Sequence, residues 1–492
     1  MDRLAPIDII IVVVYLAGTT ILGAWFTRRQ RDTRRYFLGD KNVPWWLILI
    51  SIVTTETSIV TYLSVPGLAF KAGGNLAFLQ LAFGYVIGRI VIAWLLLPMY
   101  FRGECFTAYQ ILRERFGTPV QRAASALFML TRTVADGLRL FLTGLLLQQC
   151  TGWPMEMSIV VVGLLTLTYT FLGGMQAIIW TDVIQFVLKM LGAILAAILI
   201  LHQLPGGWDE FRRVGTAGGK LNLFDFSTDP AIPYTFWAGL FGGAIFSMAS
   251  HGVDQMMVQR YLCARSLNQA RASLVLSGFV VLLQFMLFLL VGVGLFALAQ
   301  FGKLPLPGDI RPDAVFGFYI VNHLPVGIVG LVIAAMLAAA MSTLSSSLNS
   351  SANAAISDFY RPIKSGQSEG HYLLAARVFT ILFGLAQMGV ALLTLAFLSS
   401  QRSVIDHVLS VAGFTTGILL GLFVLGGRPK PVSSTSALVG MATGVLVVTA
   451  TWMPSTWSEP FVAWPWFAPI GAIATIGMAL VWDQLTRHRR PS

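Results

Sequence analysis

The sequence contains few charged residues: Asp, Glu, Lys and Arg make up 11% of its 492 residues, whereas hydrophobic residues make up 56%. Soluble domains carry roughly 25% charged residues, so the composition excludes an ordinary soluble protein. Apolar runs of about 20 residues, the length that crosses a bilayer as a helix, recur along the whole chain. We count about thirteen such spans and predict an all-α integral membrane protein.

Cysteine and catalytic motifs are also scarce. The three cysteines, Cys105, Cys150 and Cys263, are too few for a disulfide framework. The chain has no Gly-rich nucleotide loop, no Cys/His spacing typical of a metal centre and no Ser-His-Asp arrangement that fits a membrane setting. We therefore predict that the protein is not an enzyme.

The basic residues that give the chain its net charge of +11 are distributed unevenly between the two sides of the membrane. When the N-terminus is placed outside, the cytoplasmic connections carry 21 lysines and arginines and the outer connections carry 8. The positive-inside rule then predicts a multi-pass protein of the cell inner (plasma) membrane, with its N-terminus outside and its C-terminus in the cytoplasm. The predicted partners are the lipid bilayer and a small solute, with no nucleic acid, and the oligomeric state stays open.

Two predicted spans turn polar at mid-depth. One contains Thr54–Ser58 and the other Ser247–Gln255, at positions one and six after a leader helix. Broken helices expose carbonyls to cations and N–H groups to anions, and corresponding breaks in two halves are typical of inverted-repeat transporters. We predict a single transmembrane domain with a five-plus-five inverted repeat. Its parts are a retained leader helix at 9–26, a first repeat at 45–204, a second repeat at 234–426 and peripheral helices at 435–486.

A third polar stretch, Ala338–Ser351, is the hydroxyl-rich second half of a membrane span. At helical spacing Ala339, Ser342, Thr343 and Ser346 share one face. Isolated Ser and Thr residues in membrane helices more often bond to the preceding turn or allow close packing. The concentration of hydroxyls in this stretch instead favours a site for a hard cation.

Several charges lie within predicted spans, where ionisable groups usually mark a solute or ion path. Glu56 is interpreted either as part of such a path or as a group that packs into the bundle and tethers a neighbouring backbone. Arg132, Asp136 and Arg139 share one face at i, i+4 and i+7. This face is interpreted as a salt-bridged strut, as a cation offered to an anionic solute, or as a hydrated face near the cytoplasmic end. Asp182 has no adjacent arginine in sequence, which predicts a cation or a proton beside it.

Four stretches together resemble the sodium:solute symporter family, and the chain is similar to its bacterial members. The stretches are Gly173–Gln185, Gly252–Tyr261, Ala338–Asn349 and Pro98–Gly117. The resemblance covers most of the chain and implies an APC/LeuT-like fold with one extra N-terminal helix and two extra C-terminal helices. Within the second stretch, Gln259 and Arg260 are interpreted as a structural anchor.

The resemblance also implies a sodium site between helices 1 and 8. It falls on the carbonyls of Ile50, Val53 and Ala339 and on the hydroxyls of Ser342 and Thr343. Neutral oxygens without a carboxylate suit a monovalent hard cation better than Ca²⁺. Some members of the family have a second sodium site, for which the matching residues are Asp182, Ser342, Ser345 and Ser346.

The solute site implied by the resemblance is bounded by helices 1, 2, 3, 6, 7 and 10. The polar side chains available there are Thr54, Glu56, Thr57, Gln80, Ser247, Ser250, His251, Gln284 and Asp406. The sequence departs from sugar-transporting members, which place an aromatic gate and an Asn near Ser250 and Ser247 and a Lys near Gln284. It also departs from the sialic acid members, whose helix 3 arginine would fall near Ala135.

We predict a secondary active symporter that couples sodium flow to the import of a small polar organic solute by alternating access. The solute classes considered are sugar-like compounds, nucleosides and carboxylates. One alternative is a proton-coupled symporter of the same fold, acting through Glu56 or Asp182. Another is a transporter-like sensor, which the lack of a soluble domain after Arg490 disfavours.

Overall fold

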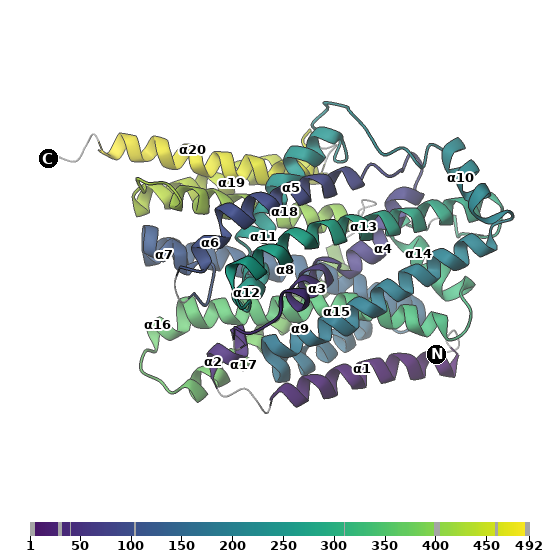
Figure 1. The fold of residues 1–492 in the computed structure, drawn as a ribbon, viewed down its shortest axis with the longest axis horizontal. Helices are drawn as coiled ribbons and strands as arrows, with labels where there is room; N and C mark the ends of the chain where they lie inside the picture. The colour runs from purple at the N-terminus through teal and green to yellow at the C-terminus, as the bar shows by residue number, and fades with distance from the viewer. Residues whose placement is uncertain are drawn as a thin grey trace.

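The computed structural model describes residues 5–27, 32–39, 41–102, 105–308, 310–397, 404–457 and 461–487. Within these ranges the fold is all-helical and contains no β-strand. The long helices lie side by side in one bundle, and the ends of the described chain lie at opposite ends of that bundle (Figure 1).

The first predicted repeat corresponds to a run of helices with short connecting elements. These are α3 (Trp45–Glu56), α4 (Ile59–Phe70), α5 (Leu79–Leu95), α6 (Leu97–Tyr100), α7 (Gln110–Phe116), α8 (Thr118–Thr151) and α9 (Met155–Gln203).

The second predicted repeat shows a similar series. Its elements are η1 (Ala238–Gly242), α11 (Gly243–Gly252), α12 (Gln255–Leu262), α13 (Leu267–Gln300), α14 (Pro312–His323), α15 (Ile328–Ala354), η2 (Ala355–Tyr360), α16 (Arg361–Ile363), α17 (Glu369–Phe397) and α18 (Val404–Gly426).

The remaining helices lie before, between and after these two series. They are α1 (Pro6–Thr27), α2 (Thr33–Leu38), α10 (Gly207–Ala217), α19 (Ser434–Trp457), η3 (Trp464–Trp466) and α20 (Phe467–Arg487). The division of the chain into two repeats stays a prediction.

Eight helices in the described ranges are long and apolar enough to cross a membrane, or nine when the bent pair α3–α4 counts as one span. The other predicted spans correspond to helices that are shorter or more polar. These are α5, the first part of α9, the charged helix α8 and the broken pair α11–α12.

Both expected helix breaks are present. Helices α3 and α4 meet at 60° across Thr57 and Ser58. Helix α11 ends at Gly252, and Asp254 begins α12 by accepting a hydrogen bond from Met256 N at 2.8 Å. A side-chain cap of this kind satisfies a helix N–H group that has no intrahelical partner.

A glycine allows the predicted corner within α9. Gly174 has φ 58° and ψ −170°, which is not helical, so α9 consists of two helices that meet at a kink there, in accordance with two predicted spans. Only glycine adopts this backbone conformation without a steric penalty.

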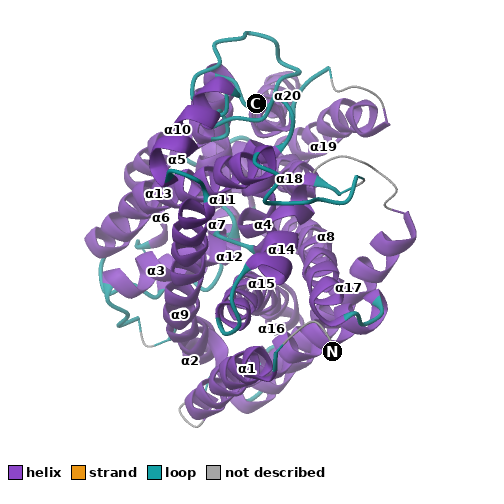
Figure 2. Ribbon diagram, turned by 90° about the vertical axis from the view of Figure 1, so that its right-hand side faces the viewer, coloured by secondary structure: helices purple, strands orange, loops and turns teal. Residues whose placement is uncertain are grey.

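Helix α15 forms the centre of the bundle. Figure 2, which looks along the helices, shows other helices on several sides of it. Within its most apolar window, 89% of residues are buried, and its hydroxyl-rich half is buried from Ser342 to Ser351. Because no part of this half faces lipid, its hydroxyls are available only to neighbouring helices or to a bound ion.

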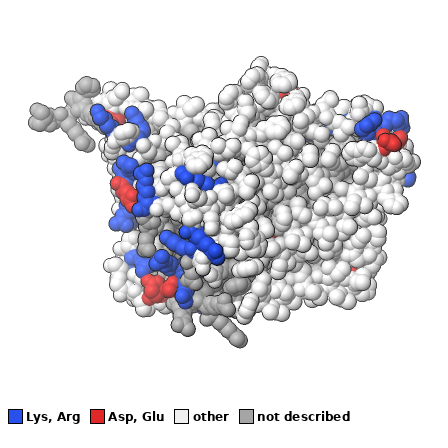
Figure 3. All heavy atoms as spheres, in the orientation of Figure 1, with Lys and Arg blue, Asp and Glu red and all other residues white. Residues whose placement is uncertain are grey.

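Basic side chains gather at the end of the bundle where α2, α7 and α16 lie (Figure 3). A smaller charged group lies at the opposite end (Figure 3), where Figure 1 places α10 with its Glu210–Arg213 ion pair. Near that end Lys220 donates to the carbonyls of Phe70 and Lys71, at 3.1 and 2.5 Å, and so caps α4. Burial, followed by the positive charge of Lys71, lowers the pKa of Lys220.

Candidate functional site

A partly open cavity of about 110 Å³ lies between the two broken helices. Its walls come from α3–α4, α5, α8, α11–α12, α13 and α18, which correspond to the six spans expected to bound a solute site. Its aromatic lining consists of Phe78, Tyr85, Phe128, Phe246 and Phe285. Its other polar lining residues are Thr55, Glu56, Ser58, Thr61, Thr131, Arg132, Arg139, Ser250, His251, Asp254, Thr415 and Thr416.

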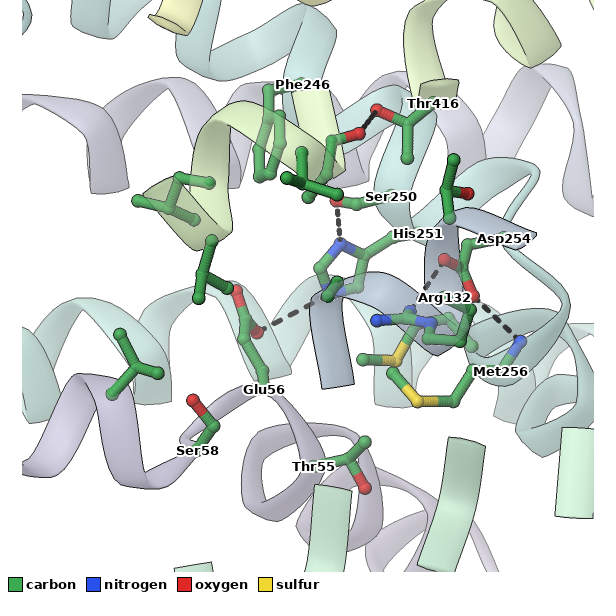
Figure 4. A pocket seen from close by; sticks show the side chains of 18 of the residues that line it. Thr55, Glu56, Ser58, Arg132, Phe246, Ser250, His251, Asp254, Met256 and Thr416 are labelled. Atoms are coloured by element: carbon green, nitrogen blue, oxygen red, sulfur yellow. Dashed lines mark hydrogen bonds and ion pairs between the residues drawn. The ribbon is translucent and has the colours of Figure 1, made fainter. Parts of the chain in front are cut away.

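Glu56 stands at the end of α3 and faces this cavity (Figure 4). Its carboxylate accepts a hydrogen bond from Arg89, a fully buried residue of α5, and lies 3.4 Å from Nε2 of His251. Arg89 also donates to Ser277 Oγ at 2.6 Å, and His251 Nδ1 lies 3.0 Å from Ser250 Oγ. The charge of Glu56 is thus compensated by the side chain of Arg89 on a neighbouring helix, and the predicted tether to a neighbouring backbone is not what these contacts show.

Two arginines of α8 line the opposite wall. Arg132 pairs with Asp254 at 2.7 Å, so it also holds the start of α12. Arg139 pairs with Asp136, while its Nε is buried and has no hydrogen-bond partner within the described residues. The predicted shared face is confirmed, and it is both a salt-bridged strut and part of the cavity lining. The i and i+7 spacing was the signal that identified these two arginines.

Four predicted solute residues lie in the same region but bond within the protein instead of lining the cavity. Thr57 Oγ1 donates to Gln284 Oε1 at 2.7 Å. Gln80 Nε2 donates to the carbonyl of Tyr234 at 3.1 Å, and Ser247 Oγ donates to the carbonyl of Tyr85 at 3.1 Å.

Two further predicted solute residues are placed differently. Thr54 Oγ1 donates to the carbonyl of Asp182 at 3.2 Å and also lies outside the lining. Asp406 belongs to the first turn of α18, and its side chain lies outside the described residues. Of the predicted solute residues with described side chains, the structure therefore brings Glu56, Ser250 and His251 together around the cavity.

The predicted sodium residues lie where α15 packs against α3 and α9. Thr343 Oγ1 donates to the carbonyl of Thr55 at 2.9 Å and lies 3.4 Å from the carbonyl of Ala339. Ser342 Oγ donates to Asp182 Oδ1 at 2.8 Å. The carbonyl of Val53 accepts from Thr57 N at 3.0 Å, and Ile50 lies one turn earlier on α3. Ala339, Ser342 and Thr343 therefore share one buried face, as the helical spacing predicts, and the structure turns this face toward α3 and α9.

Asp182 has a positively charged partner that the sequence did not reveal. Arg260 of α12 is fully buried, lies 3.4 Å from Asp182 Oδ2 and donates to Ser51 Oγ at 2.9 Å. It also donates to Ser346 Oγ at 2.5 Å. The sequence predicts a cation or a proton beside Asp182, and the fold places there the guanidinium of Arg260, which is 78 residues away in the sequence.

Ser345 is the fourth residue of the predicted second sodium site. Its hydroxyl donates to the carbonyl of Ser342 at 3.1 Å, within its own helix. Among the described residues, the structure contains no cluster of three or more His, Cys, Asp or Glu side chains arranged to hold a metal ion. The oxygens around α15 come mainly from hydroxyls and carbonyls, which suit sodium better than a divalent or transition metal.

A helical bundle in which two spans break around a buried polar cavity defines a secondary transporter with a LeuT-like fold. Solved transporters of similar architecture support this class, and the fold expected from the sequence is confirmed. Residues 36–444 match the sodium:solute symporter family. The chain belongs to that family.

Relatives and a solved structure agree with this assignment. The chain is 28% identical to the sodium/sialic acid symporter NanT of Aliivibrio fischeri, over 96% of this chain and 92% of the relative. It is 31% identical to the sodium/sialic acid symporter SiaT of Proteus mirabilis, over 89% of this chain and 87% of the relative. A solved structure of a sodium-coupled sialic acid symporter, in a substrate-bound outward-open state with a novel sodium site, matches at a TM-score of 0.87. It has 26% identity and covers 98% of both chains.

The protein is thus a multi-pass membrane transporter that couples sodium to the symport of a small organic solute. Sodium is the coupling ion, and the solute and the bilayer are the partners that this activity requires.

Proposed function

We propose that the transported solute carries a carboxylate and binds in the cavity beside Arg132 and Arg139. The unpartnered Nε of Arg139 is the observation that carries this proposal. An arginine side chain has five N–H donors in a planar fork that matches a carboxylate. A buried donor without an acceptor is costly, and an anionic solute would supply the missing acceptor.

The surrounding acidic groups do not oppose an anionic solute. Glu56 is compensated by Arg89 and Asp254 by Arg132, so the acidic side chains of the cavity do not present a free negative charge that would repel an anion. The aromatic wall supplies apolar contacts, and it strengthens ionic hydrogen bonds by excluding water. The relatives named as sialic acid symporters transport an acidic sugar, which belongs to this class.

The arginines are displaced along α8 relative to the pattern of the sialic acid members of the family. The helix 3 arginine of those members would fall near Ala135, which lines the cavity here. Arg132 lies about one turn before Ala135 and Arg139 about one turn after it, on the same face. Either guanidinium therefore points toward the same space from a neighbouring turn.

We further propose that sodium binds to the carbonyls of Ile50, Val53 and Ala339 and to the hydroxyls of Ser342 and Thr343. An ion at this position would join the first half of a broken helix to the central helix. It would stabilise the arrangement of α3 that also places Glu56 in the cavity wall. Because ion and solute would then favour one conformation, each would raise the affinity for the other.

The proposed orientation places the N-terminus outside and the C-terminus in the cytoplasm of the plasma membrane. The basic end of the bundle in Figure 3 would then face the cytoplasm, in accordance with the positive-inside rule. The ends of the described chain lie at opposite ends of the bundle, as this topology requires (Figure 1).

The solute class is tested by comparing acids with their methyl esters, which keep the scaffold and lose the charge. We expect sialic acid or another small acid to stabilise the purified protein in sodium buffer, and its ester to bind about tenfold or more weakly. Arg139→Gln should abolish this discrimination, whereas Arg139→Lys should retain part of it. Equal affinity for acid and ester would contradict the proposal.

A further inference from the structure

Lys189 is a buried lysine in the membrane-spanning part of α9, among otherwise apolar residues. Its side chain is fully buried. A buried ammonium group is costly unless other groups replace its water shell. The partners of Lys189 therefore indicate what the group does in this fold.

Those partners are two backbone carbonyls at the first helix break. Lys189 Nζ donates to the carbonyl of Thr54 at 2.6 Å and to the carbonyl of Thr57 at 2.9 Å. Helix α3 ends at Glu56, so its last carbonyls lack partners within the helix. The carboxyl end of a helix also carries partial negative charge. Lys189 thus places a positive charge at the position of the break that attracts cations.

The other carbonyls of the break already have partners. That of Val53 accepts from Thr57 N at 3.0 Å, and that of Glu56 accepts from Ser58 N at 2.9 Å. That of Thr55 accepts from Thr343 Oγ1 at 2.9 Å. From Val53 to Thr57, the two carbonyls without a backbone or hydroxyl donor are the two that Lys189 contacts. The lysine therefore occupies a position where broken helices in transporters commonly coordinate an ion.

The charges around Lys189 disfavour a further free cation there. Asp182 lies two turns earlier on α9, and its carboxylate already pairs with Arg260 at 3.4 Å. From α4, the hydroxyl of Tyr62 donates to the backbone carbonyl of Lys189 at 3.5 Å, which encloses the lysine from that side. One carboxylate is thus accompanied by two side-chain cations in a region that excludes water.

We propose that Lys189 is a tethered cation that replaces an exchangeable one at the carbonyls of Thr54 and Thr57, so that the transporter couples its solute to a single sodium ion. This inference rests on the proposed sodium site between α3 and α15. Together with Arg260, which pairs with Asp182 at the predicted second sodium site, it favours one coupled ion over the two that the sequence leaves open. Because the lysine side chain is part of the protein, it stabilises the break between α3 and α4 and is not itself transported.

The test compares the sodium-induced rise in melting temperature of the purified full-length protein, measured against choline. Lys189→Met should lower the melting temperature in choline and should show a larger rise with sodium, because the two carbonyls become available to a second ion. Two sites of equal affinity would give about twice the wild-type rise. Lys220→Met is the matched control, because Lys220 also donates to two helix-end carbonyls but lies away from the proposed ion sites. Its sodium-induced rise should equal that of the wild type.

Lys189→Gln separates charge from hydrogen bonding, because it keeps an N–H donor and loses the charge. Its sodium-induced rise should exceed that of the wild type, as in Lys189→Met. A rise equal to the wild-type value in both Lys189 variants would overturn the tethered cation while leaving the sodium site intact. No rise in the wild type would overturn the sodium site itself, and this proposal with it.

Discussion

Removing the hydroxyl of Thr343 tests one proposed ligand of the sodium site. Thr343→Val keeps the approximate shape of the side chain but loses the Oγ1 that donates to Thr55 and lies 3.4 Å from the carbonyl of Ala339. One proposed sodium ligand disappears, and a buried carbonyl loses its donor. An unsatisfied buried acceptor costs about 1–3 kcal/mol, which should lower the melting temperature.

Loss of the same hydroxyl should also weaken sodium binding. If the lost ligand weakens sodium binding by about 1.4 kcal/mol, the sodium concentration for half-maximal uptake rises about tenfold. Thr343→Ser keeps the hydroxyl and should stay near the wild-type value. Ser350→Ala is a control on the same helix, because the Ser350 hydroxyl bonds to its own helix at Ser347.

The assay is uptake into proteoliposomes at graded sodium concentrations with a fixed membrane potential. An unchanged half-maximal sodium concentration in Thr343→Val, with normal folding and protein amount, would refute the assignment of this hydroxyl to sodium. A shift of the same size in Ser350→Ala would refute the reasoning as well, because it would show a general effect of removing hydroxyls from α15.

Two further predictions concern stability. Glu56→Gln leaves the buried Arg89 without a compensating charge, so the melting temperature should fall by the equivalent of about 3 kcal/mol. Arg213→Gln, in an ion pair outside the bundle core, should leave the melting temperature unchanged. Similar melting curves for the two variants would contradict the role of the buried pair. Gly67→Ala would place a Cβ 2.4 Å from a backbone carbonyl at the start of α14, so the protein should lose about 1–3 kcal/mol of stability. Gly18→Ala, whose Cβ would meet nothing within 4 Å, should be tolerated, and equal losses in both glycine variants would count against this packing.

Local features of the fold could be predicted from the sequence because they depend on spacing along one helix. The polar clusters around Glu56 and Asp254 marked the two breaks, and i, i+3 and i+4 spacing placed Ser342 and Thr343 on one face. Those features were confirmed. The α9 corner was likewise predictable, because the conformation at Gly174 suits glycine alone.

The partners of Glu56, Asp182 and Lys189 could not be predicted, because they come from helices far apart in sequence. Arg89 reaches Glu56 across 33 residues, and Lys189 reaches Thr54 across 135. The sequence pattern indicates how deep in the membrane such residues lie. It does not show which neighbouring helix each face of a helix contacts. For the same reason Gln80 was expected at the solute site, although its side chain bonds to the segment before η1 instead.

The cationic wall of the cavity could be predicted only in part. The shared face of Arg132 and Arg139 followed from their spacing, but the sequence did not show whether that face was turned toward a cavity or toward another helix. Packing against α11–α12 and α18 decides this, because residues of those helices complete the lining. The anionic solute is therefore a proposal of the structure and the relatives together.

The central claim is that sodium and solute bind to the same conformation of this transporter. Its most direct test is the dissociation constant of a bound acidic solute, measured on the purified protein at fixed pH and ionic strength in sodium and then in choline. The account predicts binding about tenfold or more tighter in sodium. Equal dissociation constants in the two buffers would contradict it.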